Sequence, residues 1–255
     1  NTFLSVMFLA CCFNGSLCAQ SDAQIYERTC DAKTYPFSDP SPVATPNNSY
    51  YPYFRFDGFS MQAQEKQWKM VVLENDYVKL TVTPEIGGKI WGAIDKVNNK
   101  EFVYTNGVVK FRDVAMRGPW TSGGIEFNFG IIGHAPTCST PIDYLTKKNV
   151  DGSVSCHIFS YEWITRTVWN VEINLPKDKA YFTTHTTWFN QSSIDQPYYQ
   201  WMNAGYATKT GTRFYYPGTY SIGHSGDLHP YPIDEEGRDV SWYDNNNFGA
   251  SKSLH

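Results

Sequence analysis

Residues 112–136 read RDVAMRGPWTSGGIEFNFGIIGHAP, and the rest of the chain is interpreted around this stretch. Glycine and proline divide it into turns, and it has no sustained helical period. Between the turns, residues 125–129 (IEFNF) alternate, so their three apolar side chains share one face of a strand. Glu126 and Asn128 share the other face. We interpret this face as the wall of a cleft; the alternative is an ordinary strand whose polar face meets solvent.

The same alternation continues on both sides of that stretch, with short polar turns between the segments. No amphipathic segment of helical length interrupts it. The pattern predicts an all-β protein, an antiparallel β-sandwich. The expected strand pairs are 69–73 with 77–83, 89–94 with 101–104, 144–148 with 153–164, 165–175 with 180–190, and 198–207 with 212–216.

The composition narrows the function classes. Of 255 residues, 41% are hydrophobic and 16% aromatic, so a packed core is expected and disorder is not. The net charge of -4 argues against a nucleic-acid partner that would need its phosphates neutralised. The phosphate-binding, dinucleotide and zinc-protease motifs are absent from the sequence, so we predict no cofactor and no metal. The many Tyr and Trp rings suit the apolar faces of sugars and also suit β-strands.

The first residues have the pattern of a leader. Residues 3–13 are continuously apolar and are followed by small residues, which is typical of a signal peptide cleaved after Ala19. Lipidation at Cys12 is the alternative. We therefore expect a secreted or periplasmic protein with an incomplete signal peptide over 1–19; lipidation would instead anchor it at the cell envelope. The sequence contains no second long apolar run, so it predicts no membrane span.

The remaining chain divides at residue 60. Proline, serine and asparagine dominate residues 20–60, which we expect to be a linker and an extended segment. Residues 61–255 form the expected sandwich domain. The chain begins at Asn1 and ends at His255 without a closing turn, so we expect a fragment with an incomplete domain.

Three cysteines lie outside the leader, and their spacing matches no zinc signature. Cys138 and Cys156 flank a predicted hairpin. They are expected either to form a disulfide in an oxidising compartment or to remain small buried thiols.

Glycoside cleavage uses two carboxyl groups, one protonated and one ionised, across a sugar ring. Glu126 is the first acid or base candidate, because burial in an aromatic strand favours a protonated carboxyl group. Asp244, in the run WYDNNN, is its proposed partner, and Glu162 is a further option. The same run lacks the glycine and the distal glutamate of a calcium loop.

Epimerase chemistry instead needs a histidine beside a carboxylate base. His134, His185 and His224 have the right chemistry, although a histidine is more often a structural hydrogen-bonding group. Arginines pair with anionic sugars, and tryptophans stack on sugar rings; the alternatives are loop anchoring and core packing. The proposed site comprises the catalytic residues Glu126, Asp244 and His134 and the binding residues Arg112, Arg117, Trp120, Asn128, His224 and Trp242.

Four long motifs carry a family resemblance. They are TVTPEIGGKIWGAIDKVNNKEFVYTN (81–106), FRDVAMRGPWTSGGIEFNFGIIGHAPT (111–137), QPYYQWMNAGY (196–206) and GRDVSWYDNNNFGASKS (237–253). Together they resemble a bacterial domain of unknown function, number 5107 in that series. The resemblance implies a carbohydrate-related, exported protein with a galactose-mutarotase-like supersandwich. It also implies tetratricopeptide repeats in further C-terminal domains.

These observations predict a secreted protein that acts on carbohydrate, with glycoside hydrolase-like acid/base chemistry. The alternatives are a non-catalytic carbohydrate-binding module of a larger repeat protein and a sugar epimerase. Catalysis requires that Glu126 share a cleft with a second acid. Binding requires only an aromatic platform and hydrogen-bonding groups.

Overall fold

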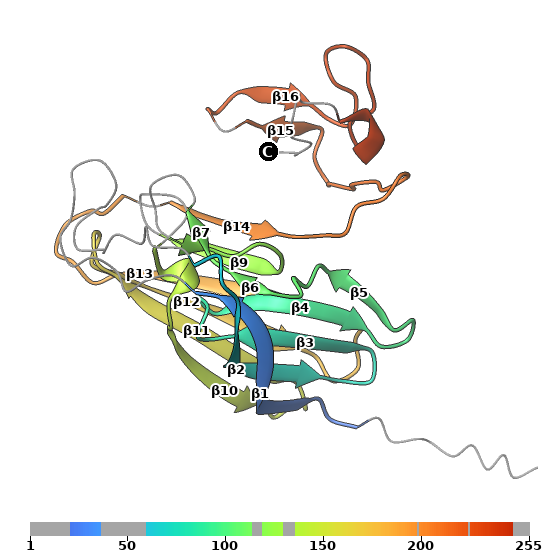
Figure 1. The fold of residues 1–255 in the computed structure, drawn as a ribbon. Coiled ribbons are helices and arrows are strands. Elements are labelled where there is room, and N and C mark those ends of the chain that lie inside the picture. Colours follow the sequence, from blue (N-terminus) through green and yellow to red (C-terminus); the bar gives the residue numbers. More distant parts are fainter. Residues whose placement is uncertain are drawn as a thin grey trace, which may run out of the picture.

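The structure is a computed structural model, and it describes residues 21–36, 60–113, 119–129, 136–197, 199–223 and 225–246. Within these residues the chain forms two stacked β-sheets followed by a small lobe (Figure 1). The strand pairs of the two stacked sheets are antiparallel except for one, which joins the first strand to the short sixth strand. The predicted all-β sandwich is confirmed. No helix in this part of the chain is long and apolar enough to cross a membrane.

The larger sheet has the order β14-β9-β4-β3-β2-β1-β6, with β5 also paired to β4. Its strands are β1 (Gln24–Tyr35), β2 (Gln64–Glu74), β3 (Val78–Thr83), β4 (Lys89–Asp95), β5 (Lys100–Val103), β6 (Val109–Lys110), β9 (Ile125–Phe129) and β14 (Gln200–Ala204). The smaller sheet has the order β10-β11-β12-β13. Its strands are β10 (Asp143–Lys148), β11 (Val154–Glu162), β12 (Thr167–Leu175) and β13 (Thr183–Asn190).

Short elements complete the described part of the chain. Strand β7 (Arg112–Asp113) pairs with β8 (Pro119–Trp120), and β15 (Tyr220–Ile222) pairs with β16 (Leu228–Pro230). Two 3-10 helices, η1 (Pro136–Ser139) and η2 (Tyr243–Asn245), lie in the connections. Four of the five predicted strand pairs form, each with ends within a few residues of the expected ones.

The core lies between the two sheets and follows from alternation. Strand β12 buries every second side chain, and the buried set faces the larger sheet. Phe129 of β9 stacks on Trp169 of β12, with ring centroids 4.4 Å apart and planes 10° from parallel. Burying such side chains stabilises the fold by about 1.5–3 kcal/mol each. The largest contributions come from Leu73, Leu80, Ile90, Phe127, Phe129, Ile158, Trp169, Ile173 and Leu175.

Asn75 joins the turns of the two sheets. Its side-chain oxygen accepts hydrogen bonds from the backbone N–H of Tyr77 and Val78, which closes the turn between β2 and β3. Its Nδ2 donates to the carbonyls of Pro176 and Lys179, 2.7 and 2.8 Å away, in the turn between β12 and β13. One buried amide therefore satisfies backbone groups from both layers.

The expected linker over residues 20–60 differs from the structure in its first part. Gln24–Tyr35 is a twelve-residue strand that pairs along most of its length with β2. Only Ile25 of β1 packs against the main core, while Glu27, Thr29 and Asp31 on the same face are exposed. The strand is held by its backbone ladder more than by apolar burial, so its sequence lacks a hydrophobic alternation.

The predicted pairing of residues 198–207 with 212–216 is wrong. Strand β14 instead pairs with β9, with Asn203 opposite Glu126 and Trp201 opposite Asn128. In the segment 212–216, Arg213 forms an isolated bridge to Trp242 inside the C-terminal lobe. The closing element of the larger sheet is therefore distant in sequence from its partner strand, a relation that a hairpin pattern does not contain.

We expect Asn75→Ala to lower the free energy of unfolding by about 2–4 kcal/mol, because four hydrogen bonds of about 1 kcal/mol each are lost. Denaturant unfolding measures this change. The matched control is Asn98→Ala in an exposed turn, where the amide donates only to Asp95. Equal effects of the two substitutions would contradict the bridging role of Asn75.

Candidate functional site

Strand β9 divides its side chains as the sequence predicts. Ile125, Phe127 and Phe129 face the core between the sheets. Glu126 and Asn128 face the outer side of the larger sheet, the side away from the smaller sheet. All five residues are buried, so the polar face of β9 does not meet solvent.

A buried polar cluster forms on this outer side. Asn128 Nδ2 donates to Glu126 Oε1 at 2.8 Å, and Glu126 is 2% exposed. Lys89 of β4 is 1% exposed, and its Nζ donates to the carbonyl and the hydroxyl of Thr121 at 2.8 and 3.1 Å. Burial lowers the pKa of Lys89, and the negative charge of Glu126 opposes that shift. The cluster is a buried cation and carboxylate joined to an amide and a hydroxyl.

Two glycines position β9 next to this cluster. Gly123 and Gly124 both have positive φ, 75° and 69°, which glycine adopts without steric cost. The backbone N–H of Gly124 donates to the carbonyl of Tyr104, and its carbonyl accepts from Gly205, both at 2.8 Å. A Cβ at Gly124 would lie 2.3 Å from the carbonyl oxygen of Ile90. The Gly-Gly pair therefore brings the ends of β5 and β14 to the start of β9.

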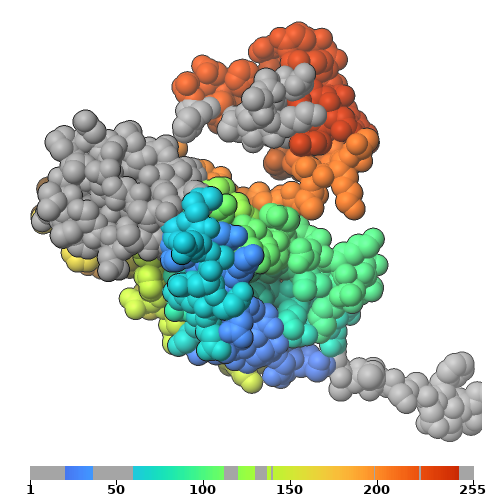
Figure 2. All heavy atoms as spheres, in the orientation of Figure 1, coloured from blue at the N-terminus to red at the C-terminus, as the bar shows by residue number. Residues whose placement is uncertain are grey.

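A groove of about 440 Å³ opens on the same outer side of the larger sheet, between β1 and β5. Strands β1 and β5 form its two walls, and β2, β3 and β4 form its floor. In Figure 2 the blue residues of β1 and the green residues after β5 border this hollow. Its lining comprises Arg28, Cys30, Asp31, Ala32, Lys33, Met70, Lys79, Thr81, Trp91, Gly92, Ile94, Glu101, Thr105, Asn106 and Gly107.

The groove combines apolar surface on its floor with polar groups on both its floor and its walls. Met70 and Trp91 supply apolar surface, and Thr81 and Thr105 supply hydroxyls. Gly92 leaves room for the Thr105 hydroxyl, since a Cβ there would lie 2.0 Å from Thr105 Oγ1. Such a surface suits a ligand that has both apolar C–H faces and hydroxyl groups.

The predicted partner of Glu126 lies elsewhere. Asp244 is exposed in η2, and its carboxylate accepts a hydrogen bond from the backbone N–H of Gly211 at 2.8 Å. Helix η2 belongs to the red C-terminal lobe, whereas β9 belongs to the larger sheet (Figure 1). The two carboxyl groups therefore lie in different parts of the molecule.

Trp242 also lies in the lobe and has a local partner. The Arg213 guanidinium lies 4.8 Å from the centre of the Trp242 ring and 5.0 Å from that of Tyr215. Arg213 also donates to Ser241 and forms an ion pair with Asp239 at 3.7 Å. The tryptophan thus packs on a cation of its own lobe.

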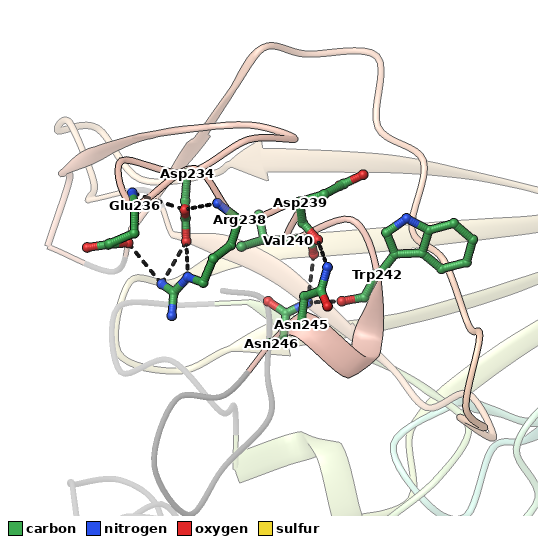
Figure 3. Close-up of polar contacts among 8 residues, drawn as sticks. All are labelled: Asp234, Glu236, Arg238, Asp239, Val240, Trp242, Asn245 and Asn246. Atoms are coloured by element: carbon green, nitrogen blue, oxygen red, sulfur yellow. Dashed lines mark hydrogen bonds and ion pairs between the residues drawn. The ribbon is translucent and has the colours of Figure 1, made fainter.

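Other polar side chains of the lobe organise its turns (Figure 3). Arg238 forms ion pairs with Asp234 at 2.7 Å and with Glu236 at 2.9 Å. Asn246 donates to the carbonyls of Val240 and Trp242 at 2.6 and 2.9 Å. The sequence of this segment is rich in acidic and amide side chains, as a binding region would be. In the structure these side chains contact neighbouring residues of the lobe.

The remaining candidates have varied surroundings. Trp120 is half-buried in β8, outside the groove lining. Glu162 is buried and accepts hydrogen bonds from the backbone N–H groups of Ile164 and Thr165, so it shapes the turn after β11. His185 is exposed on β13 of the smaller sheet. Arg117, His134 and His224 lie outside the described residues, and Arg112 is described only through its backbone.

Cys138 and Cys156 are both buried and form no disulfide with each other. Cys138 lies in η1, and Cys156 lies in β11 within the main core. Burial raises the pKa of the Cys156 thiol to about 12, so it behaves as an apolar core residue.

Two features of the outer side, the buried cluster and the groove, were not predicted from the sequence. Lys89 is the first residue of the sequence KIWGAI, whose other residues are apolar. A single charged residue in such a buried strand indicates a buried polar partner. Arg28 carries no comparable signal, because β1 itself was expected to be a linker. The groove joins residues from five strands and the loop after β5, which no local pattern contains.

Residues 45–255 match the family described as Domain of unknown function (DUF5107). The chain belongs to the DUF5107 family. The predicted family is therefore confirmed, and the match includes every residue of β9 and both glycines before it.

A solved structure has the same fold as this DUF5107 domain. The chain is similar to a TPR-domain containing protein from Parabacteroides distasonis ATCC 8503, with a TM-score of 0.72 and 25% sequence identity. The alignment covers 79% of this chain and 35% of that protein. The chain therefore spans about a third of the length of the structure it resembles, in agreement with the predicted association with tetratricopeptide repeats.

We expect Lys89→Met to lower the free energy of unfolding by about 3–5 kcal/mol, because it removes two hydrogen bonds of a buried ammonium group to Thr121, each of about 1.5–3 kcal/mol, and a positive charge near the buried Glu126. The double variant Lys89→Met/Glu126→Gln should recover part of this loss, since the glutamine is neutral and still pairs with Asn128. Denaturant unfolding of both single variants and the double variant at pH 7 measures the coupling. Strictly additive losses would mean that the two charges do not interact.

We expect Gly124→Ala to destabilise the domain by at least about 1–2 kcal/mol, because alanine is strained at positive φ and its Cβ meets Ile90. The control is Gly107→Ala, where a Cβ would meet open space. Thermal unfolding of the two variants distinguishes them. A Gly124→Ala variant as stable as the control would show that the Gly-Gly turn is not constrained.

Proposed function

We propose that this DUF5107 domain is a non-catalytic carbohydrate-binding module whose ligand occupies the groove on the outer side of the larger sheet. The observation that carries the proposal is the combination of an apolar floor at Trp91 and Met70 with hydroxyl and amide groups at the walls. Sugars offer the matching surfaces, an apolar ring face and a rim of hydroxyls. The groove volume of about 440 Å³ lies in the range typical of small-ligand sites.

Binding is favoured over cleavage by the positions of the carboxyl groups. Glycoside cleavage needs two of them on either side of one sugar ring. Glu126 is buried beneath the outer side and makes a hydrogen bond with Asn128. In the groove, Glu101 faces the ligand space. Asp31 follows Cys30 on β1, so strand alternation directs its side chain to the opposite face of the sheet, away from the groove. The groove therefore offers one inward-facing acid among the described residues.

The likeness to a TPR-domain containing protein supports a role within a larger assembly. Tetratricopeptide repeats stack helical pairs into extended surfaces that bind other chains. A sugar-binding domain joined to such repeats would couple recognition of a glycan to recognition of a protein. Export across the inner membrane, predicted from residues 3–13, would expose the domain to environmental glycans.

We expect the protein to bind oligosaccharides from a plant and host glycan array, and we expect Thr81→Trp to weaken binding by at least about tenfold. Thr81 is half-buried in the groove floor, so an indole there fills the ligand space. The control is Thr187→Trp on an exposed position of β13 in the smaller sheet. Titration calorimetry with the best array ligand measures both. Unchanged binding by Thr81→Trp would remove the groove as the site.

The same ligands test the non-catalytic part of the proposal. After long incubation with the protein, chromatography should recover each oligosaccharide intact. Glu126→Gln should leave the affinity unchanged, because the side chain lies outside the groove lining. Products that the unmodified protein releases and the Glu126→Gln variant does not would overturn the proposal in favour of a hydrolase.

A further inference from the structure

We propose that the ligand of the groove is an acidic saccharide, one that carries a uronate carboxylate or a sulfate ester, and that Arg28 binds its anionic group. The inference rests on the proposed carbohydrate-binding function and names the ligand class of the same groove. Arg28 lies on β1 opposite Met70, so it projects from one wall next to the apolar floor.

The Arg28 side chain is exposed and makes no ion pair with any carboxylate in the described part of the chain. The arginines of the C-terminal lobe behave differently. Arg238 pairs with Asp234 and Glu236, and Arg213 pairs with Asp239. A guanidinium presents paired N–H donors whose geometry matches a carboxylate or a sulfate. At Arg28 these donors face the groove and are available to a ligand.

The other charges of the outer side leave a positive balance near Arg28. Lys79 is 3.6 Å from Glu74, which also pairs with Lys96 at 2.7 Å. Buried Lys89 and Glu126 offset one another. Lys79 and Lys96 share the single carboxylate of Glu74, and Arg28 and Lys66 add two further positive charges on this side, against the one acid Glu101. The chain as a whole has a net charge of -4, so this local balance is opposite in sign to that of the protein.

The two walls differ in charge, and the difference orients the ligand. Arg28 lies on the β1 wall, and Glu101 lies on the β5 wall opposite Ile94. An anionic group is attracted to the first wall and repelled by the second. The neutral hydroxyls of the sugar then lie near Thr105 and Asn106, while its apolar ring face lies over Trp91.

The test compares three probes of equal chain length with the full chain by titration calorimetry: an oligogalacturonate, a sulfated galacto-oligosaccharide and a neutral galacto-oligosaccharide. At low salt, at least one acidic probe should bind about tenfold or more tightly than the neutral probe. Raising the salt should reduce this preference, since screening weakens an exposed ionic contact. The two acidic probes distinguish a carboxylate ligand from a sulfate ligand.

Three variants assign the preference to Arg28. Arg28→Gln should abolish it while leaving the binding of the neutral probe unchanged, and Arg28→Lys should retain part of it. Lys147→Gln removes one positive charge from exposed β10 and should have no effect. Because Arg28 is exposed, its variants should unfold at the same temperature as the unmodified protein.

The possible outcomes separate the two proposals. If all three probes bind equally, or if the acidic preference survives in Arg28→Gln, the inference about Arg28 is overturned and the carbohydrate-binding function stands. If none of the probes and no saccharide of the array binds, the proposed function fails as well.

Discussion

The burial of β9 on both faces is the constraint on which the rest of the structure depends. One face supplies Phe127 and Phe129 to the core, where Phe129 stacks on Trp169 of the opposite sheet. The other face carries Glu126 and Asn128. Their burial would destabilise the fold if these side chains had no polar partners. Lys89 and Thr121 provide those polar surroundings. The packing of the two sheets and the polar cluster on the outer side are thus consequences of one five-residue strand.

The buried cluster and the open groove have separate physical roles on the same side of the larger sheet. Neighbouring buried charges add little net stability relative to apolar packing, but the removal of one of them is costly. Such a cluster therefore favours a single register of β4 against β9. That register fixes Trp91 and Gly92, which follow Lys89 on β4 and form part of the groove floor. The rigid cluster and the accessible groove are in this way linked through one strand.

The C-terminal lobe illustrates how composition can mislead. Its tryptophan, acids and asparagines have the residue types of a sugar site, and Asp244 was the expected partner of Glu126. In the structure Trp242 packs on Arg213, and Asp244 accepts a hydrogen bond from Gly211. Loop-rich segments without regular ladders need side chains to satisfy their backbone groups, and they recruit the same polar residues that ligand sites use.

The sequence by itself determined the local structure. Two-residue alternation identified the paired strands, and Asp-Gly and Gly-Gly steps identified turns where positive φ is observed, because these properties depend on neighbouring residues alone. The division of β9 into an apolar and a polar face was predictable for the same reason. Only the tertiary structure decided that β1 joins the larger sheet, that β14 pairs with β9, and that the polar face of β9 is buried. It also brought Arg28, Thr81 and Glu101 to one groove. Backbone ladders and shared grooves join residues that are distant along the chain, and the free energy of such contacts leaves no periodic mark in the sequence.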